Sequence, residues 1–178
     1  HGDVTYDPAS AGRQMNAHFA SRNLYPNGTW RPQTQMYNTA SDISPTAAQM
    51  PRAVGFAYAS VIYRNIKELQ DQKDFSNNGN EIAFGTIGNA STSEGMFWEA
   101  VNAIGVLKAP AILTIYDDGY GISVPNQFQM VKENIGSLLK GFERDLNAPP
   151  ETIERGYDHY TVRAWDYPAL LETYLSAA

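Results

Sequence analysis

The sequence contains no cysteine, no cluster of basic residues and no long apolar run. The lack of cysteine excludes disulfides, thiolate metal sites and a cysteine nucleophile, and it fits a protein of the reducing cytoplasm. The formal net charge of -6 argues against a general binder of nucleic acid or membrane surfaces, because such binders need clustered Lys and Arg. No apolar run approaches the ~18 residues of a membrane span. We therefore expect a cytoplasmic protein with no nucleic-acid partner and no membrane segment.

The two ends of the sequence suggest that it is a fragment. The first residues, HGDVTYDPAS, form neither a basic nor an apolar signal region. The sequence also lacks an initiating Met and stops abruptly at LETYLSAA, so we expect a fragment of a longer protein. With 178 residues, of which 43% are hydrophobic and 18% charged, the chain fits one soluble, globular domain. The sequence therefore predicts a single, incomplete domain over residues 1–178.

The first part of the chain, residues 1–44, is predicted to be an irregular arm. It is rich in Asn, Pro, Gly, Ser and Thr, and it shows little sustained periodicity. One short helix near residues 11–20 is the regular element that we expect there.

The remainder, residues 45–178, is predicted to form an α/β core. Ser44 and Pro45 give a helix start signal. The apolar pattern predicts helices over 50–72, 93–108, within 126–145 and from 166 onward, and strands over 81–85, 110–116 and 159–164. Strands that alternate with helices in this way are typical of an open, mainly parallel sheet with helices on both faces.

A turn with the sequence GNASTS follows the first predicted strand, at residues 88–93. In open α/β sheets, ligands bind beyond the carboxyl ends of the strands, where the amides of the next helix can meet an anion. Gly88 would allow close backbone approach, and Ser91 could donate a hydroxyl hydrogen bond. The same residues would also make an ordinary tight turn between a strand and a helix.

A carboxylate pair, Asp117 and Asp118, ends the second predicted strand. If the two strands are neighbours, this pair lies beside Asn89. Mg²⁺ prefers oxygen ligands and often joins one or two carboxylates to substrate phosphates, so Asn89, Asp118 and backbone carbonyls could hold it. Asp117 is better explained as a residue that caps the turn than as a metal ligand.

Residues 81–125 resemble the thiamine-diphosphate motif of a known family. The family is the decarboxylating component of 2-oxoacid dehydrogenase complexes, alpha-subunit type, whose motif begins Gly-Asp-Gly and ends Asn-Asn. Gly88 and Asn89 match the start of that motif, and Asp117-Asp118 match its end. The 29 positions from Asn89 to Asp118 agree with the spacing in the family.

The resemblance extends through most of the chain. Arg13-Gln14-Met15 with His18, and Ile43-Ser44-Pro45 before Gln49-Met50-Pro51, look like the segments that precede the motif, especially in enzymes for branched-chain 2-oxoacids. The stretches DDGYGISVP and AWDYPAL look most similar to bacterial forms in which the alpha and beta parts are fused. The implied fold is the thiamine-diphosphate-binding fold.

The family's site residues transfer onto this sequence position by position. The implied metal ligands are Asn89, Asp118 and the carbonyl of Tyr120, and His18 matches a histidine near the family's active site, although a structural role explains a lone His as well. The positions that the resemblance assigns to cofactor binding are Ser44, Thr46, Gly88, Asn89, Ala90, Ser91, Asp118, Tyr120 and Ile122.

The sequence departs from the family's pattern at three kinds of position. The first metal ligand, usually Asp, is Asn89, and the second, usually Asn, is Asp118, so the exchange is reciprocal and leaves the local charge unchanged. Ala90 replaces the second glycine of the motif. Ala48 stands where branched-chain enzymes often have a Thr that helps to hold potassium, so the resemblance leaves a potassium site open.

The resemblance implies an enzyme that carries out oxidative decarboxylation of branched-chain 2-oxoacids such as 2-oxoisovalerate, with thiamine diphosphate and Mg²⁺ and with acyl transfer to a lipoyl group. The implied partners are a beta-type part, fused or separate, and a lipoyl-bearing acyltransferase component, in a dimer or heterotetramer. The beta part supplies the glutamate that activates the cofactor, so this chain alone is expected to be half a site and inactive. The alternatives are pyruvate or acetoin dehydrogenase, a transketolase-like enzyme, and a non-catalytic module that retains the fold.

Overall fold

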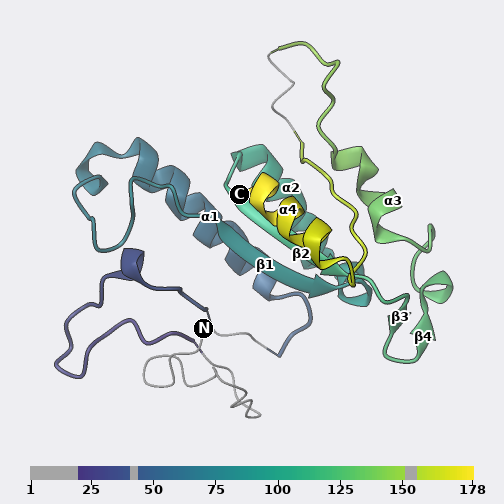
Figure 1. Ribbon diagram of the computed structural model, residues 1–178, viewed down its shortest axis with the longest axis horizontal. Helices are drawn as coiled ribbons and strands as arrows, with labels where there is room; N and C mark the ends of the chain where they lie inside the picture. Colours follow the sequence, from purple (N-terminus) through teal and green to yellow (C-terminus); the bar gives the residue numbers. More distant parts are fainter. Residues whose placement is uncertain (1–19, 41–43, 151–155) are drawn as a thin grey trace.

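The computed structural model describes residues 20–40, 44–150 and 156–178 (Figure 1). Within residues 20–40, the part of the predicted arm that is described, the backbone is irregular apart from the 3-10 turn η1 (Gln33–Gln35) and one bridge between Leu24 and Trp30. The short helix predicted near residues 11–20 lies outside the described residues except for its last position. No helix in the described ranges has the length and apolar character that a membrane crossing requires.

The first long helix, α1 (Gln49–Asn65), begins where the sequence predicts and ends seven residues earlier. It stops because Ile66 is extended, with φ -98° and ψ 110°, and a 3-10 turn η2 (Lys67–Leu69) follows. The buried face of α1 is made largely of small residues, so the helix approaches the sheet closely. A Cβ atom on Gly85 would lie 3.3 Å from the methyl carbon of Met50 and 3.7 Å from the Cβ of Ala53.

The centre of the fold is the predicted crossover unit. Strand β1 (Ala83–Gly88), helix α2 (Gly95–Leu107) and strand β2 (Ala111–Tyr116) follow one another, and the two strands pair in parallel from Ala83↔Ala111 to Gly88↔Tyr116. Helix α2 contributes Phe97, which is completely buried and stabilises the fold by about 1.5 to 3 kcal/mol. The core cluster around Phe97 consists of Ala47, Met50, Ile87, Ala100, Val101, Met130 and Ile135.

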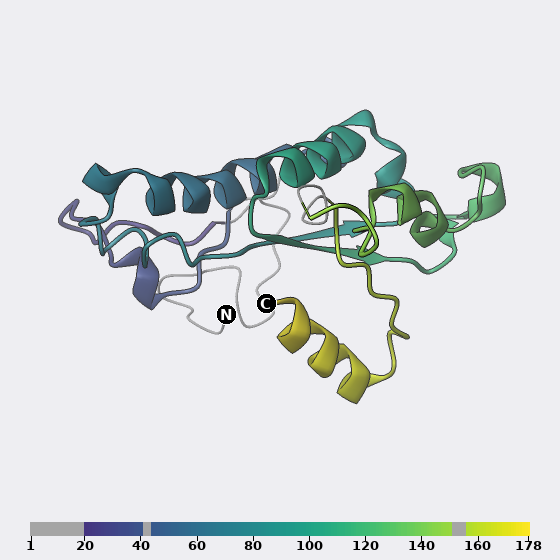
Figure 2. The same ribbon diagram turned by 90° about the horizontal axis from the view of Figure 1, so that it is seen from above.

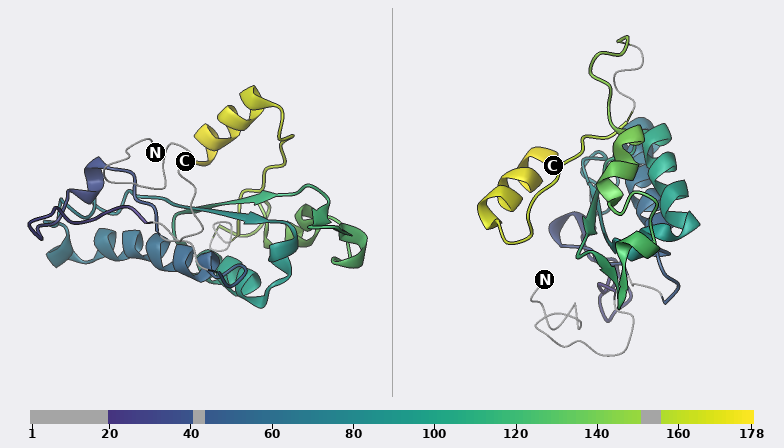
Figure 3. Two further views of the ribbon diagram at one scale, coloured as in Figure 1. Left: turned by 90° about the horizontal axis from the view of Figure 1, so that it is seen from below. Right: turned by 90° about the vertical axis from the view of Figure 1, so that its right-hand side faces the viewer.

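The helices lie on both sides of this two-stranded sheet. Helices α1 and α2 cover one face, and α4 (Tyr167–Ala177) lies across from them (Figures 2 and 3). Helix α4 starts as predicted, because the Asp166 carboxylate accepts a hydrogen bond from the Ala169 amide. It reaches the sheet through Tyr174, whose hydroxyl lies 3.0 Å from the hydroxyl of Thr114 and whose ring meets Phe84 edge-on. The result is a mixed helix and strand arrangement with a small parallel sheet, which is compatible with an α/β fold.

The segment between β2 and α4 is less regular than the sequence predicts. After β2 come a short hairpin of β3 (Tyr120–Gly121) and β4 (Val124–Pro125), the turn η4 (Asn126–Phe128), helix α3 (Ile135–Leu139) and the turn η5 (Lys140–Phe142). The predicted helix within residues 126–145 is therefore present but short. It begins only after Glu133, which has a positive φ of 57°, and Asn134, whose side chain accepts a hydrogen bond from Ser137 N.

The predicted strand over residues 159–164 is wrong. The chain there is irregular, and its neighbour Tyr157 forms only an isolated bridge with Glu143. The Tyr157 hydroxyl donates to the Val101 carbonyl in α2, and the His159 ring pairs with the Glu143 carboxylate at 2.8 Å. These side-chain contacts hold the segment against α2 and η5, so it does not take a place beside β2.

The loop between α1 and β1 is held by one carboxylate. Glu81 accepts hydrogen bonds from the Ser76 hydroxyl, at 2.6 Å, and from the Asn77 amide. Burial raises the pKa of Glu81, but these hydrogen bonds and the nearby Arg64 outweigh burial and leave its pKa below the ordinary value of 4.5. Glu81 is therefore ionised at neutral pH, and its hydrogen bonds hold the chain just before β1.

Candidate functional site

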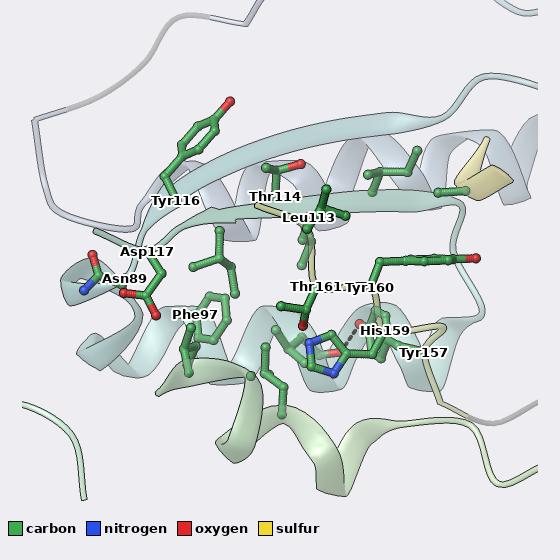
Figure 4. Close-up of a pocket in the computed structure, with 18 of the residues that line it drawn as sticks. Asn89, Phe97, Leu113, Thr114, Tyr116, Asp117, Tyr157, His159, Tyr160 and Thr161 are labelled. Carbon is green, nitrogen blue, oxygen red and sulfur yellow. Dashed lines mark hydrogen bonds between the residues drawn. The ribbon is translucent and has the colours of Figure 1, made fainter. Parts of the chain in front are cut away.

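The carboxyl ends of β1 and β2 lie next to each other, because the strands are parallel and in register up to Gly88 and Tyr116. The backbone N–H of Asn89 donates to the Tyr116 carbonyl at 3.0 Å, so the strand pairing continues for one more residue. The loop after β1 and the loop after β2 therefore leave the sheet side by side. Figure 4 shows Asn89 and Asp117 together at one end of a pocket, with Tyr157 and His159 toward the other.

Hydrogen bonds engage the backbone N–H, the carbonyl and the side-chain Nδ2 of Asn89, and leave only its Oδ1 without one among the described residues. The residue is 3% exposed, its Nδ2 donates to Asn126 Oδ1 at 2.6 Å, and its carbonyl accepts from the Thr92 amide and hydroxyl. Within the described ranges, Asn89 Oδ1 accepts no hydrogen bond, and it is not sealed from solvent. This oxygen is thus fixed in place, and no hydrogen bond from the described residues occupies it.

Asp117 and Asp118 differ in what they do. Asp117 Oδ1 accepts from Gly119 N at 3.0 Å and from Asn126 Nδ2 at 3.1 Å, so this carboxylate caps the turn that follows β2. Asp118 Oδ1 accepts from Tyr120 N at 3.0 Å, and the Asp118 side chain is exposed. Most of the acceptor capacity of Asp118 is therefore open to a ligand.

The Tyr120 carbonyl faces away from the hairpin. Asn126 N donates to Gly119 O at 3.0 Å, and bonded and non-bonded pairs alternate along an antiparallel ladder. Tyr120, opposite Pro125, is therefore in a non-bonded pair, which suits Pro125 because proline has no N–H. The Tyr120 carbonyl lies on the outer edge of the hairpin, the same edge on which Asp118 meets the Tyr120 amide.

The turn after β1 offers donors for an anion. Gly88 is exposed, and a Cβ atom placed on it would meet only the Ser91 hydroxyl, at 4.0 Å. In the part of the chain that the structure describes, the amides of Ala90 and Ser91 donate to no protein acceptor. These two backbone N–H groups stand at the start of the 3-10 turn η3 (Ala90–Ser93). Successive backbone N–H groups in a turn can together bind an anion.

Most of the residues predicted from the sequence line one pocket. They are Thr46, Gly88, Asn89, Ala90, Ser91, Asp118, Tyr120 and Ile122, whereas Ser44 is exposed outside the pocket and His18 lies outside the described residues. The pocket has a volume of about 1710 Å³, which exceeds the ~300 to 1,000 Å³ of a typical small-molecule site. It continues along β2 toward Tyr157 and α4, so it is larger than the binding site of one small ligand.

The described residues contain no group of three His, Cys, Asp or Glu side chains that could hold a metal ion. The candidate ligand set has a single carboxylate, Asp118, together with the Asn89 amide oxygen and the Tyr120 carbonyl. These oxygens suit a hard cation such as Mg²⁺ that keeps waters and takes further oxygens from a phosphate. The donor chemistry fits the implied metal, although it is not a carboxylate cluster.

Two residues of the site could not be recognised in the sequence. Asn126 is buried and bridges Asn89 and Asp117, and Gly121 packs against Ala90.

The resemblance assigns Ile122 to the site, but the backbone conformation of Ile122 is unexpected. It has a φ of 59° at the tip of the hairpin and a fully exposed side chain. A β-branched residue is an outlier in this left-handed region, and such strain clusters at functional sites.

Comparison with known proteins identifies the family to which the sequence is similar. The model of the dehydrogenase E1 component family matches residues 4–143. The alpha subunit of 2-oxoisovalerate dehydrogenase from Bacillus subtilis (strain 168) is 33% identical over 173 residues, which cover 94% of this chain and 44% of that protein. The mitochondrial alpha subunit from Caenorhabditis elegans is 33% identical, with 69% of this chain and 22% of that protein covered. The one from Mus musculus is 30% identical, with 80% and 26% covered. The chain thus spans less than half the length of these curated relatives.

Proposed function

This chain belongs to the dehydrogenase E1 component family, and we propose that it provides the cofactor-binding part of a branched-chain 2-oxoacid dehydrogenase. Its relatives named 2-oxoisovalerate dehydrogenase subunit alpha support this substrate class over pyruvate or acetoin. The observation that carries the proposal concerns Asn89 Oδ1, at the adjoining ends of two parallel strands. This oxygen is fixed in place and accepts no hydrogen bond from any residue that the structure describes.

The cofactors that we propose are thiamine diphosphate and Mg²⁺. Bound thiamine diphosphate supplies the electron sink for decarboxylation. Asn89 Oδ1, an Asp118 oxygen and the Tyr120 carbonyl would hold the cation, and the amides of Ala90 and Ser91 would donate to the diphosphate. Gly88 leaves room for the diphosphate to approach the backbone. The role of this chain is to bind and orient the cofactor and to neutralise part of its charge.

The larger assembly is part of the same proposal. The two-stranded parallel sheet with helices on either side would belong to an open, mainly parallel sheet of the thiamine-diphosphate-binding fold. A beta-type part, fused or separate, would complete the site, and a lipoyl-bearing acyltransferase would accept the acyl group in a dimeric or heterotetrameric enzyme. The pocket, which extends well beyond Asn89, leaves space for such a neighbour.

The proposal is tested on the assembled enzyme by comparing kcat/KM for 2-oxoisovalerate and pyruvate in the presence of thiamine diphosphate and Mg²⁺. We expect 2-oxoisovalerate to be preferred and this chain alone to be inactive. Preference for pyruvate would overturn the substrate class, and turnover by this chain alone would overturn the half-site.

A non-catalytic module is the second candidate, because Asn89 and Ala90 depart from the family's motif. Calorimetric titration of the assembled protein with thiamine diphosphate and Mg²⁺ separates the two candidates. Saturable binding supports the enzyme, whereas no heat of binding at millimolar cofactor would favour the module.

A further inference from the structure

Asn126 lies between Asn89 and Asp117 and uses its whole side-chain amide. It is 6% exposed, and its Nδ2 donates to Asp117 Oδ1 at 3.1 Å and to the Glu133 carbonyl at 3.3 Å. Its Oδ1 accepts from Asn89 Nδ2 at 2.6 Å. Two donors and one acceptor are thus engaged by three different segments of the site.

The Asn126 amide has only one workable orientation. Its Nδ2 faces a carboxylate and a backbone carbonyl, which are both acceptors. Rotating the amide by 180° would place Oδ1 against these two acceptors and leave buried polar groups unpaired. Asn126 Oδ1 must therefore face position 89, and position 89 must offer it a donor.

Of the two side chains Asn and Asp, only Asn at position 89 meets both demands made on it. Asn89 gives Nδ2 to Asn126 and keeps Oδ1 for a ligand, whereas an ionised carboxylate has no donor for Asn126 Oδ1. The hydrogen bond also polarises the Asn89 amide toward a more negative Oδ1, because a donated N–H bond strengthens the acceptor at the other end. Groups behind a metal ligand often orient and tune it in this way.

We propose that Asn126 is a positioning residue that selects Asn over Asp at position 89 and turns the amide oxygen of Asn89 toward the divalent cation. This inference rests on the proposed function, because it deepens the account of the same site. It explains why Asn stands where the resemblance leads one to expect Asp: the requirement comes from Asn126 and not from the metal.

The test is a double-mutant cycle on the assembled enzyme. The variants are Asn89→Asp, Asn126→Ser and the double variant. The Ser hydroxyl can rotate to donate or to accept, so it tolerates either side chain at position 89. Gln127→Glu is the matched control, since it makes the same amide-to-carboxylate change on the exposed neighbour of Asn126. Should Asn126→Ser not fold, Asn126→Thr carries the same hydroxyl with more volume.

Two quantities are measured for each variant: the Mg²⁺ dissociation constant at saturating thiamine diphosphate, and the Tm of the metal-free protein. We expect Asn89→Asp to weaken Mg²⁺ binding by about tenfold and to lower Tm, although it introduces a stronger metal ligand. In the Asn126→Ser background, the additional Asn89→Asp change should lower neither the Mg²⁺ affinity nor the Tm. Gln127→Glu should change both quantities little.

The outcomes separate this inference from the proposed function. If Asn89→Asp has equal effects with and without Asn126→Ser, or binds Mg²⁺ at least as tightly as the wild type, the inference is wrong. If the wild type binds neither Mg²⁺ nor thiamine diphosphate, the proposed function fails. In that case the Tm values still decide whether Asn126 selects Asn over Asp at position 89.

Discussion

A Cβ atom on Gly121 would lie 2.7 Å from the Cβ of Ala90, closer than two carbon atoms can approach without a shift. Gly121 belongs to the hairpin after β2, and Ala90 opens the turn after β1. The hairpin and the turn are therefore packed so tightly that an alanine is accommodated at position 90 only because position 121 has no side chain.

The first prediction concerns this pair. Gly121→Ala should destabilise the protein by about 1 to 3 kcal/mol, because overpacking displaces its neighbours. Adding Ala90→Gly should restore part of the loss. The Gln129 side chain, whose Nε2 and Oε1 atoms would clash with the new Cβ, accounts for the rest. Urea unfolding of the four proteins measures the coupling, and strictly additive effects would show that the two positions are independent.

The second prediction separates the two adjacent carboxylates. Asp118→Ala should weaken Mg²⁺ binding at least about tenfold, since it removes the only carboxylate of the proposed ligand set. Asp117→Asn should leave Mg²⁺ affinity nearly unchanged, because an amide oxygen can still accept from Gly119 N and cap the turn. Calorimetry on the assembled enzyme compares them, and the proposed ligand set would be refuted by unchanged affinity after Asp118→Ala.

The third prediction is a dependence of stability on pH through Glu81. The pKa of Glu81 is lowered in the folded protein, so its contribution to stability is present above 4.5, the ordinary value, and is lost as the pH falls through the folded pKa. Glu81→Gln should lower Tm at neutral pH and should make Tm fall less steeply as the pH drops below 4.5. Parallel Tm curves for wild type and variant would contradict a lowered pKa.

The fourth prediction places stability and cofactor binding in opposition at Ile122. Ile122→Gly should stabilise the metal-free protein by about 1 kcal/mol, because glycine adopts the left-handed conformation without the penalty of a Cβ. Ile122→Ala keeps that penalty and serves as the control for loss of the side chain. Both variants should bind thiamine diphosphate more weakly if the exposed side chain contacts the cofactor. Unchanged affinity in both would remove Ile122 from the site.

The centre of the fold was predictable from the sequence because its signals are local. An apolar run, a helical spacing and a second apolar run specify β1, α2 and β2, and parallel pairing then brings Asn89 beside the residues after Tyr116. The number of residues between Asn89 and Asp118 can be read from the sequence alone. The roles of the nine proposed cofactor contacts and of His18 stay predictions.

The rest depended on contacts that no local pattern encodes. The alternation over residues 159–164 suggested a strand, but Tyr157 and His159 tie that segment to α2 and η5. The helix within residues 126–145 lost its first turn to the left-handed Glu133 and the cap at Asn134. Asn126 was missed for the same reason, because its importance comes from a hydrogen bond across 37 positions of sequence.

The hydrogen bond from Asn89 N to Tyr116 O makes the proposed site sensitive to how the chain has folded. If β2 slipped by one residue along β1, Asp118 would move by about 3.3 Å and the side chains of β2 would change faces. Such a misfolded protein could keep two paired strands and two helices, yet Asp118 would be displaced from the position in which we propose that it binds the cation together with Asn89. Cofactor binding would then stabilise only the chains whose strands are correctly aligned, because a ligand shifts the equilibrium toward the state that binds it.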